Sequence, residues 1–154
     1  MNNQIKHPPM AMWLLICLQL LLGLGALGGG GVMLAAPDGS LIQMPLSMLE
    51  NSPFSNFLIP GVILFSLLGI YPVSVAYCLW RQPAWWLPEA LNPVKHLHWS
   101  WAASLAAGII LLIWISTQVL LIQSIVFLHI LYFVWGWVLI LLTLNPTVRQ
   151  HLKK

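Results

Sequence analysis

Long apolar runs dominate the pattern of hydrophobic and polar positions along this chain. They cover residues 11–36, 57–80, 100–122 and 125–144, and each reaches the roughly 20 residues with which a helix crosses about 30 Å of hydrocarbon. Transmembrane strands would alternate polar and apolar residues over about ten positions, whereas these runs are apolar throughout. The pattern predicts an all-α polytopic membrane protein, residues 1–154 forming a single domain of four transmembrane helices in an antiparallel bundle.

Composition excludes a soluble globular protein. The chain is 60% hydrophobic and 6% charged, against about 25% charged residues in ordinary soluble domains. Stretches of 31, 30 and 53 residues contain no Asp, Glu, Lys or Arg. The first run could be confused with a signal peptide, but its apolar stretch exceeds the usual roughly 7–15 residues and the bulky Leu34 occupies the −3 position for cleavage after Ala36. We therefore interpret it as a span.

Charge predicts the orientation of these spans. All six basic residues fall on one side of a four-span drawing, and two of the three acidic residues, Asp38 and Glu50, fall on the other. The positive-inside rule then places both termini and the 81–99 loop in the cytoplasm and the 37–56 loop outside. The net charge of +3 reflects this orientation, and the chain has no basic run that indicates a nucleic-acid partner. The basic residues are Lys6, Arg81, Lys95, Arg149, Lys153 and Lys154.

The outer loop, residues 37–56, is rich in turn residues and apolar anchors. Pro37-Asp38-Gly39 is typical of a turn, and Pro45 with the apolar residues after it favours a short helix laid on the membrane. We expect this loop to be ordered and packed over the bundle. Asp38 and Glu50 have two interpretations, as turn and cap residues or as a site for a cation or a ligand amine.

The first run is dense in glycine, and the second contains a proline. Gly25 and Gly29 have the small-xxx-small spacing of close helix crossings, with Gly28 beside them. The predicted crossing lies within the chain or between two copies of it; the alternative is a backbone that opens to line a ligand pocket. In the second run, Pro72 with Gly69 one turn earlier should kink the helix and make space for packing or for a small cavity.

The membrane interior is expected to contain no Asp, Glu, Lys or Arg, which argues against ion pumps and proton-coupled transporters. The strongest polar candidates are Ser116, Thr117 and Gln118 in the third run and His129 and Tyr132 in the fourth. Gln118 and His129 should lie at similar depth, about 7 Å below the outer end. One hypothesis is an interhelical hydrogen bond worth about 0.6–2 kcal/mol. The other is a polar patch under the outer loop that recognises a quinone, a lipid headgroup or a similar amphiphile.

Metal and cofactor sites are not predicted. His96 and His98 lack the i, i+4 spacing of helical metal ligands. A haem held by two histidines fails on depth, since His129 is alone near the outer face. Cys17 and Cys78 face a reducing compartment without a Cys-x-x-Cys motif, so we interpret them as small buried hydrophobes.

The outer-loop motifs carry a family resemblance. Ala36-Pro-Asp-Gly-Ser-Leu, Met44-Pro-Leu, Leu49-Glu-Asn-Ser-Pro-Phe and Phe57-Leu-Ile-Pro-Gly, together with Trp114-Ile-Ser-Thr-Gln-Val in the third run, resemble a family of small uncharacterised bacterial four-helix membrane proteins. The resemblance implies the same architecture in a bacterial cytoplasmic (inner) membrane. It favours the outer loop, Gln118 and the fourth-span face as a shared working surface, and it carries no activity over to this chain.

Two function hypotheses follow. The first is a non-enzymatic accessory or binding subunit with an outward-facing recognition surface, since no residues resemble a nucleophile, a paired acid and base or a metal cage. Its expected surroundings are the lipid bilayer, with a membrane-protein partner, a second copy of the chain or a hydrophobic small molecule left open. The alternative is a membrane enzyme or carrier for a quinone or lipid-like molecule, using a pocket around His129 and Gln118 that opens outward.

Overall fold

The computed structural model describes residues 7–154. It confirms the prediction of four helices long and apolar enough to cross a membrane, and each helix begins and ends within two residues of its predicted bounds. Within the described residues no strand forms, and the sole β-type pairing is an isolated bridge between Leu97 and Lys153. The four spans are α1 (Met10–Ala35), a second span over Leu58–Arg81, α5 (Trp99–Ile122) and α6 (Phe127–Leu144).

The second span contains a change of helix type before Pro72. It begins as α2 (Leu58–Ile63), continues as a π-helical segment, η3 (Leu64–Ile70), and ends as α3 (Tyr71–Arg81). Proline cannot donate an N–H and its ring collides with the carbonyl four residues earlier in an α-helix. The wider π turn, in which the Tyr71 N–H reaches the Ser66 carbonyl, relieves this conflict. The irregularity expected at Pro72 therefore takes the form of a π segment just upstream.

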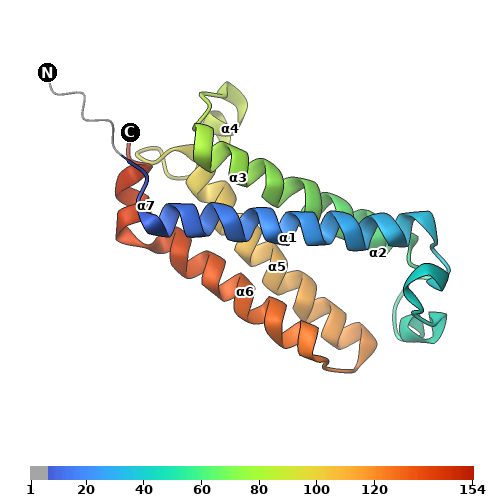
Figure 1. The fold of residues 1–154 in the computed structure, drawn as a ribbon. Coiled ribbons are helices and arrows are strands. Elements are labelled where there is room, and N and C mark those ends of the chain that lie inside the picture. The colour runs from blue at the N-terminus through green and yellow to red at the C-terminus, as the bar shows by residue number, and fades with distance from the viewer. Residues whose placement is uncertain (1–6) are drawn as a thin grey trace, which may run out of the picture.

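Two ends of the bundle can be distinguished in Figure 1. The loop end carries residues 36–57, which join α1 to α2 through two short 3₁₀ turns, η1 (Ser40–Ile42) and η2 (Leu46–Leu49). The α7 end carries the start of α1 together with α4 (Trp86–Leu91) and α7 (Pro146–His151).

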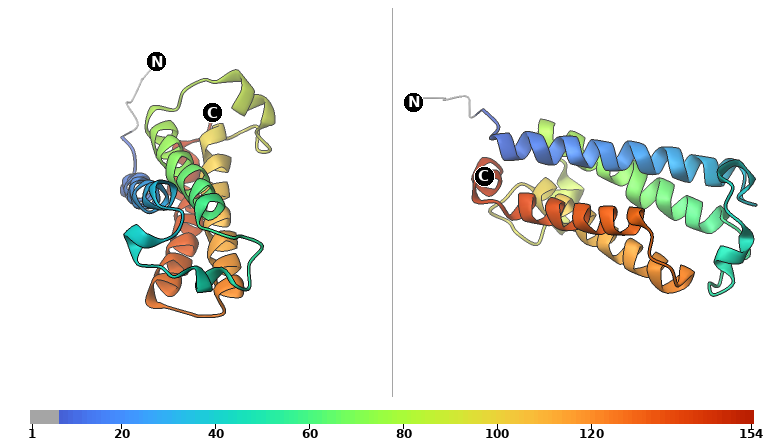
Figure 2. Two further views of the ribbon diagram at one scale, coloured as in Figure 1. Left: turned by 90° about the vertical axis from the view of Figure 1, so that its right-hand side faces the viewer. Right: turned by 60° about the horizontal axis from the view of Figure 1, so that its bottom comes forward.

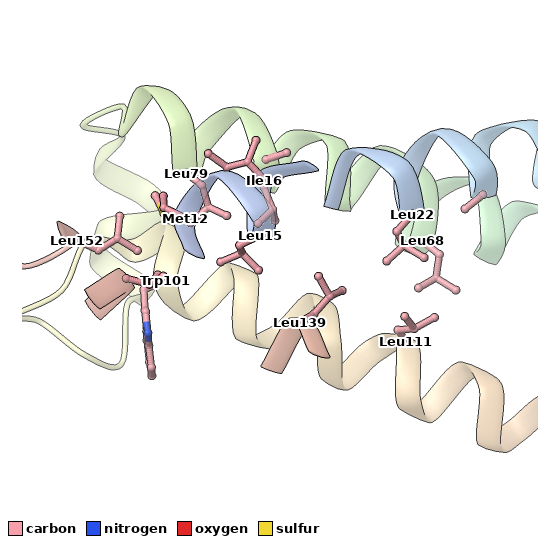
Figure 3. Packing of buried hydrophobic residues seen from close by; sticks show 14 of the residues in the cluster. Met12, Leu15, Ile16, Leu22, Leu68, Leu79, Trp101, Leu111, Leu139 and Leu152 are labelled. Atoms are coloured by element: carbon pink, nitrogen blue, oxygen red, sulfur yellow. The ribbon is translucent and has the colours of Figure 1, made fainter. Parts of the chain in front are cut away.

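Packing is tightest toward the α7 end. Figure 3 shows Met12, Leu15, Leu79 and Leu152 gathered there, all at most 1% exposed. Toward the loop end, α5 and α6 diverge from α1 in Figure 1, and the right-hand view of Figure 2 shows the same separation. The four spans are thus a compact bundle at one end and a splayed one at the other.

Residues after the second span close the α7 end. The His98 N–H donates to the Leu152 carbonyl over 2.8 Å, and Lys154 forms an ion pair with Glu89 of α4. The hydrogen bond from Lys154 holds the pKa of the Glu89 carboxyl below its usual value. The 81–99 loop and the C-terminal residues are therefore joined by main-chain and side-chain bonds.

A chain of buried polar groups connects three spans closer to the α7 end. The Gln19 amide donates to the Ser104 hydroxyl over 3.2 Å, and the Ser104 and Thr143 hydroxyls are 2.8 Å apart. Thr143 donates to the Leu139 carbonyl, so Ser104 is the donor to Thr143. The hydrogen bonds therefore all point the same way, from Gln19 to the Leu139 carbonyl. All three side chains are 0% exposed, and Gln19 Oε1 is left without a partner among residues 7–154. The second span joins at this level through the Tyr71 hydroxyl, which donates to a carbonyl of α5 over 2.9 Å.

Two glycines of α1 let the second span approach closely. A Cβ at Gly23 would lie 2.6 Å from the Val73 side chain, and a Cβ at Gly30 would lie 2.7 Å from the backbone nitrogen of Phe65. Neither distance is sterically acceptable, so only glycine fits at these positions. Gly23 and Gly30 are seven residues apart and therefore share one face of the helix.

The glycines at which a crossing was predicted, Gly25, Gly28 and Gly29, are not where α1 and the second span approach most closely. A Cβ at Gly25 would meet only the Tyr132 hydroxyl, at 3.8 Å; one at Gly29 would meet a leucine methyl at 3.5 Å; and one at Gly28 would meet nothing within 4 Å. Of the three, Gly29 alone faces the second span, and it does so at ordinary van der Waals distance. A crossing between two copies of the chain stays a prediction.

Candidate binding site

Two cavities lie at the loop end, where the helices diverge. The first cavity, of about 360 Å³, lies among the second span, α5 and the 36–57 loop. The second cavity, of about 310 Å³, lies among α1, η3, α5 and the start of α6. Both volumes fall in the range of about 300–1,000 Å³ that is typical of small-molecule sites. The two cavities adjoin, because they share six lining residues: Met33, Met44, Leu68, Trp114, Gln118 and Ile122.

The 36–57 loop lies over both cavities. Its base is closed by the Phe57 N–H, which donates to the Pro37 carbonyl over 2.8 Å. Gly39 has a φ of +79° and a Cβ there would overlap the Met44 carbonyl oxygen, so the turn requires glycine. The Met44 N–H donates back to the Gly39 carbonyl over 3.1 Å. This tight turn positions Met44 where it lines both cavities.

Four polar side chains line the second cavity: Gln118, His129, Tyr132 and Ser124, the last of which is exposed in the turn between α5 and α6. The expected hydrogen bond between Gln118 and His129 is not among those that residues 7–154 form. Instead, His129 Nδ1 accepts the Val126 N–H over 3.2 Å, closing the first turn of α6. Because Nδ1 is the acceptor, the hydrogen of the neutral ring is on Nε2. His129 is 9% exposed and lines the second cavity, and its Nε2–H is the hydrogen-bond donor that the ring has left.

Thr117 and the two acidic residues of the loop are placed differently. Thr117 lines the first cavity, but its hydroxyl already donates to the Ile113 carbonyl over 2.8 Å. Asp38 is exposed, and its carboxylate accepts both the N–H and the hydroxyl of Ser40, over 3.1 and 2.7 Å. These bonds lower the pKa of Asp38 and favour its interpretation as a turn residue. Glu50 follows η2 and is exposed as well, and neither carboxylate lines a cavity.

The glycine-rich part of α1 forms one wall of the second cavity. Gly25 and Gly29 line it, while α1 remains a continuous helix as far as Ala35. The backbone thus does not open, and it is the missing side chains that leave the space. Gly28 lies outside this wall and provides a matched position on the same turn of helix.

The apolar lining contains residues that the sequence pattern did not single out as a site. Met33, Met44 and Met48 line the second cavity and Trp114 lines both. Methionine is flexible and polarizable, and it adapts to irregular apolar partners. The usable signal is that three of the six methionines in the chain fall within sixteen residues, in and beside the 36–57 loop.

The arrangement is suited to binding a molecule with a long apolar part and a small polar group. The described residues contain no group of three or more His, Cys, Asp or Glu that could hold a metal ion. Comparison with protein-family models, with curated proteins and with solved structures gives no match to this chain. The cavities and their polar border are therefore the features from which a function must be argued.

Proposed function

We propose that this chain is a small membrane-embedded binding protein that holds a hydrophobic molecule under its outer loop, without acting on it chemically. The observation that carries the proposal is the pair of adjoining apolar cavities of about 360 and 310 Å³ at the loop end, bordered by Gln118, His129 and Tyr132. Few precisely placed polar groups in a mostly apolar concavity are typical of a binding site for a lipid-like ligand.

The proposed topology is an antiparallel bundle in a bacterial cytoplasmic membrane with the loop end outside and both termini inside. Charge supports it. The basic residues that the structure describes lie around the α7 end, on or beside α3, α4 and α7, while Asp38 and Glu50 lie at the loop end. Lys6 falls outside the described residues. A bias of Lys and Arg toward the short cytoplasmic segments is what the positive-inside rule requires, and this orientation opens the cavities toward the outer leaflet.

The residues that line the cavities are better suited to binding a ligand than to catalysing a reaction. A general acid or base needs a titratable group within reach of the substrate, and His129 is the one titratable side chain, Tyr132 apart, among those that line the cavities. Its Nδ1 is already engaged in closing the first turn of α6. An accessory role beside another membrane protein is compatible with this proposal and stays a prediction.

The experiment uses the full chain in vesicles with a monoacylglycerol that carries a photoreactive diazirine on its acyl chain. After irradiation, mass spectrometry locates the labelled peptides. We expect saturable labelling of the segments that contain Met33, Trp114 and Tyr132. Gly25→Leu should lower labelling around Tyr132 several-fold, because the new side chain occupies the second cavity where only the Tyr132 hydroxyl is near.

The matched control is Gly28→Leu, which makes the same chemical change on the same helix where a Cβ meets nothing within 4 Å. It should label like the unmodified protein. Gln118→Leu, which removes the amide at nearly constant volume, should weaken labelling while leaving expression unchanged. Equal labelling of the Gly25→Leu and Gly28→Leu variants would contradict the proposal, because it would show that the probe reaches these peptides from bulk lipid.

A further inference from the structure

We infer that the molecule bound here is a two-chain lipid without net negative charge, which places one chain in each cavity and its polar head beside Gln118. The inference rests on the proposed function and specifies its ligand. Three independent features lead to it: the pairing of the cavities, the unused amide of Gln118 between them with further polar groups in the second cavity, and the charge of the loop end.

The cavities are a matched pair. Their volumes, about 360 and 310 Å³, are similar, and they adjoin along a shared border that includes Met33, Met44 and Trp114. A single-chain ligand would fill one cavity and leave the lining of the other without contact partners, which forfeits dispersion attraction on that side. A molecule that branches into two chains near the shared border fills both.

The head position follows from the polar atoms. Gln118 is the polar residue that lines both cavities, and its amide supplies two donors and an acceptor. His129 supplies its Nε2–H, since Nδ1 is occupied by the Val126 N–H. Tyr132 supplies a hydroxyl close to Gly25. Groups of this kind match ester carbonyls and hydroxyls, which are the polar groups at the branch point of a diacyl lipid.

Charge at the loop end selects the headgroup. Asp38 and Glu50 are exposed there, whereas the described basic residues lie at the α7 end, at least one span away from the loop. An anionic headgroup would meet two negative charges and no positive one, and like charges brought together disfavour a partner. A neutral headgroup avoids this repulsion, and the Gln118 amide can form hydrogen bonds with its polar atoms.

The test compares two photoreactive probes with the same acyl chain, monoacylglycerol and diacylglycerol, on the full chain in vesicles. The second cavity is blocked by Gly25→Leu and the first by Ile113→Trp, since Ile113 lines only the first cavity. Gly28→Leu and Leu120→Trp are the controls, because neither position lines a cavity. We expect either block to lower diacylglycerol labelling several-fold in both cavities, and to lower monoacylglycerol labelling only in the blocked one.

Each outcome bears on a different part of the account. If either block removes diacylglycerol labelling only from its own cavity, or if monoacylglycerol alone labels, the two-chain inference is overturned and the proposed function stands. If neither probe labels the lining of either cavity saturably, or if both blocking variants label as strongly as their controls, the proposed function itself fails. In competition, unlabelled diacylglycerol should displace the probe at lower concentration than phosphatidylglycerol does; equal displacement overturns the inference about charge.

Discussion

At the scale of single residues, the polar side chains of the spans divide into a satisfied set and an unused set. Ser104 donates a hydrogen bond to Thr143, and Thr143 donates one to the Leu139 carbonyl. In hydrocarbon such bonds are worth about 0.6–2 kcal/mol each. Gln118 and the Nε2–H of His129, by contrast, border a cavity. Unused hydrogen-bonding capacity at membrane depth is costly. Gln19 Oε1 and Trp135 Nε1 also lack a partner among residues 7–154, but neither residue lines a cavity, so the proposal places the ligand beside Gln118 and His129.

His98 gives a pH-dependent prediction at the same scale. Its Nδ1 accepts the Ser100 N–H at the start of α5, and burial lowers its pKa from the ordinary value of 6.5. A depressed histidine pKa means that the unfolded chain takes up the proton more readily. The contribution of His98 to stability is thus fully present above that ordinary value and is lost as the pH falls below it. Thermal unfolding in detergent should therefore occur at lower temperature in mild acid.

The variant His98→Asn isolates this effect. Asparagine is a good N-cap and keeps an acceptor for the Ser100 N–H, but it does not titrate. We expect its unfolding temperature to depend less on pH between about 7.5 and 5, the range in which histidine changes charge. An unchanged slope in the variant would show that other groups cause the acid sensitivity.

At the scale of elements, α1 presents glycine on different faces for different purposes. Gly23 and Gly30 allow the backbone of the second span to approach. Gly25 and Gly29 leave space in the second cavity. Gly28 touches nothing within 4 Å. Because each of these roles depends on which neighbour faces the residue, substitutions a few positions apart should have opposite effects.

Gly30→Ala should destabilise the protein, whereas Gly28→Ala should not. A Cβ at Gly30 would lie 2.7 to 2.9 Å from backbone and side-chain atoms of Phe65, and overpacking of this kind costs about 1–3 kcal/mol. At Gly28 the added methyl finds open space, and alanine gains up to about 1 kcal/mol of helix propensity. Thermal unfolding in mild detergent measures both. Equal stability of the two variants would contradict the assigned crossing.

The elements themselves could be predicted from the sequence, but their faces could not. Apolar runs that lack charge determine where a helix must cross, and the four spans follow within two residues. A run such as residues 28–31, which is entirely glycine, contains no periodic signal that says which residue meets a neighbour. The prediction chose Gly25 and Gly29 by spacing alone, while the contacting pair, Gly23 and Gly30, is determined by the path of the second span.

At the scale of the whole molecule, the proposed function rests on the difference between the two ends. The α7 end is packed around Met12, Leu15 and Leu152 and is closed by bonds from the C-terminal residues. The loop end is splayed, and the 36–57 loop covers the space that results. In the proposed function, the packed α7 end keeps the bundle folded while the splayed loop end leaves space for an apolar ligand.

The location of the candidate site could be anticipated in part. Helix rise alone places Gln118 and His129 at similar depth near the outer end, and the structure brings both to the second cavity. The cavities themselves arise from the divergence of α5 and α6 from α1, which is a tertiary property without a local pattern. Trp114 therefore could not be separated from ordinary membrane-facing residues, and the clustering of three methionines is the one sequence signal that points to the lining.

The most direct test of the central claim is native mass spectrometry of the full chain extracted from its own membrane in mild detergent. The account predicts a lipid adduct on the unmodified protein and on the Gly28→Leu variant, and its loss or several-fold reduction in Gly25→Leu, whose new side chain enters the second cavity. An adduct that is equally abundant in both variants, or absent from the unmodified protein, would contradict the claim that the loop end is a binding site.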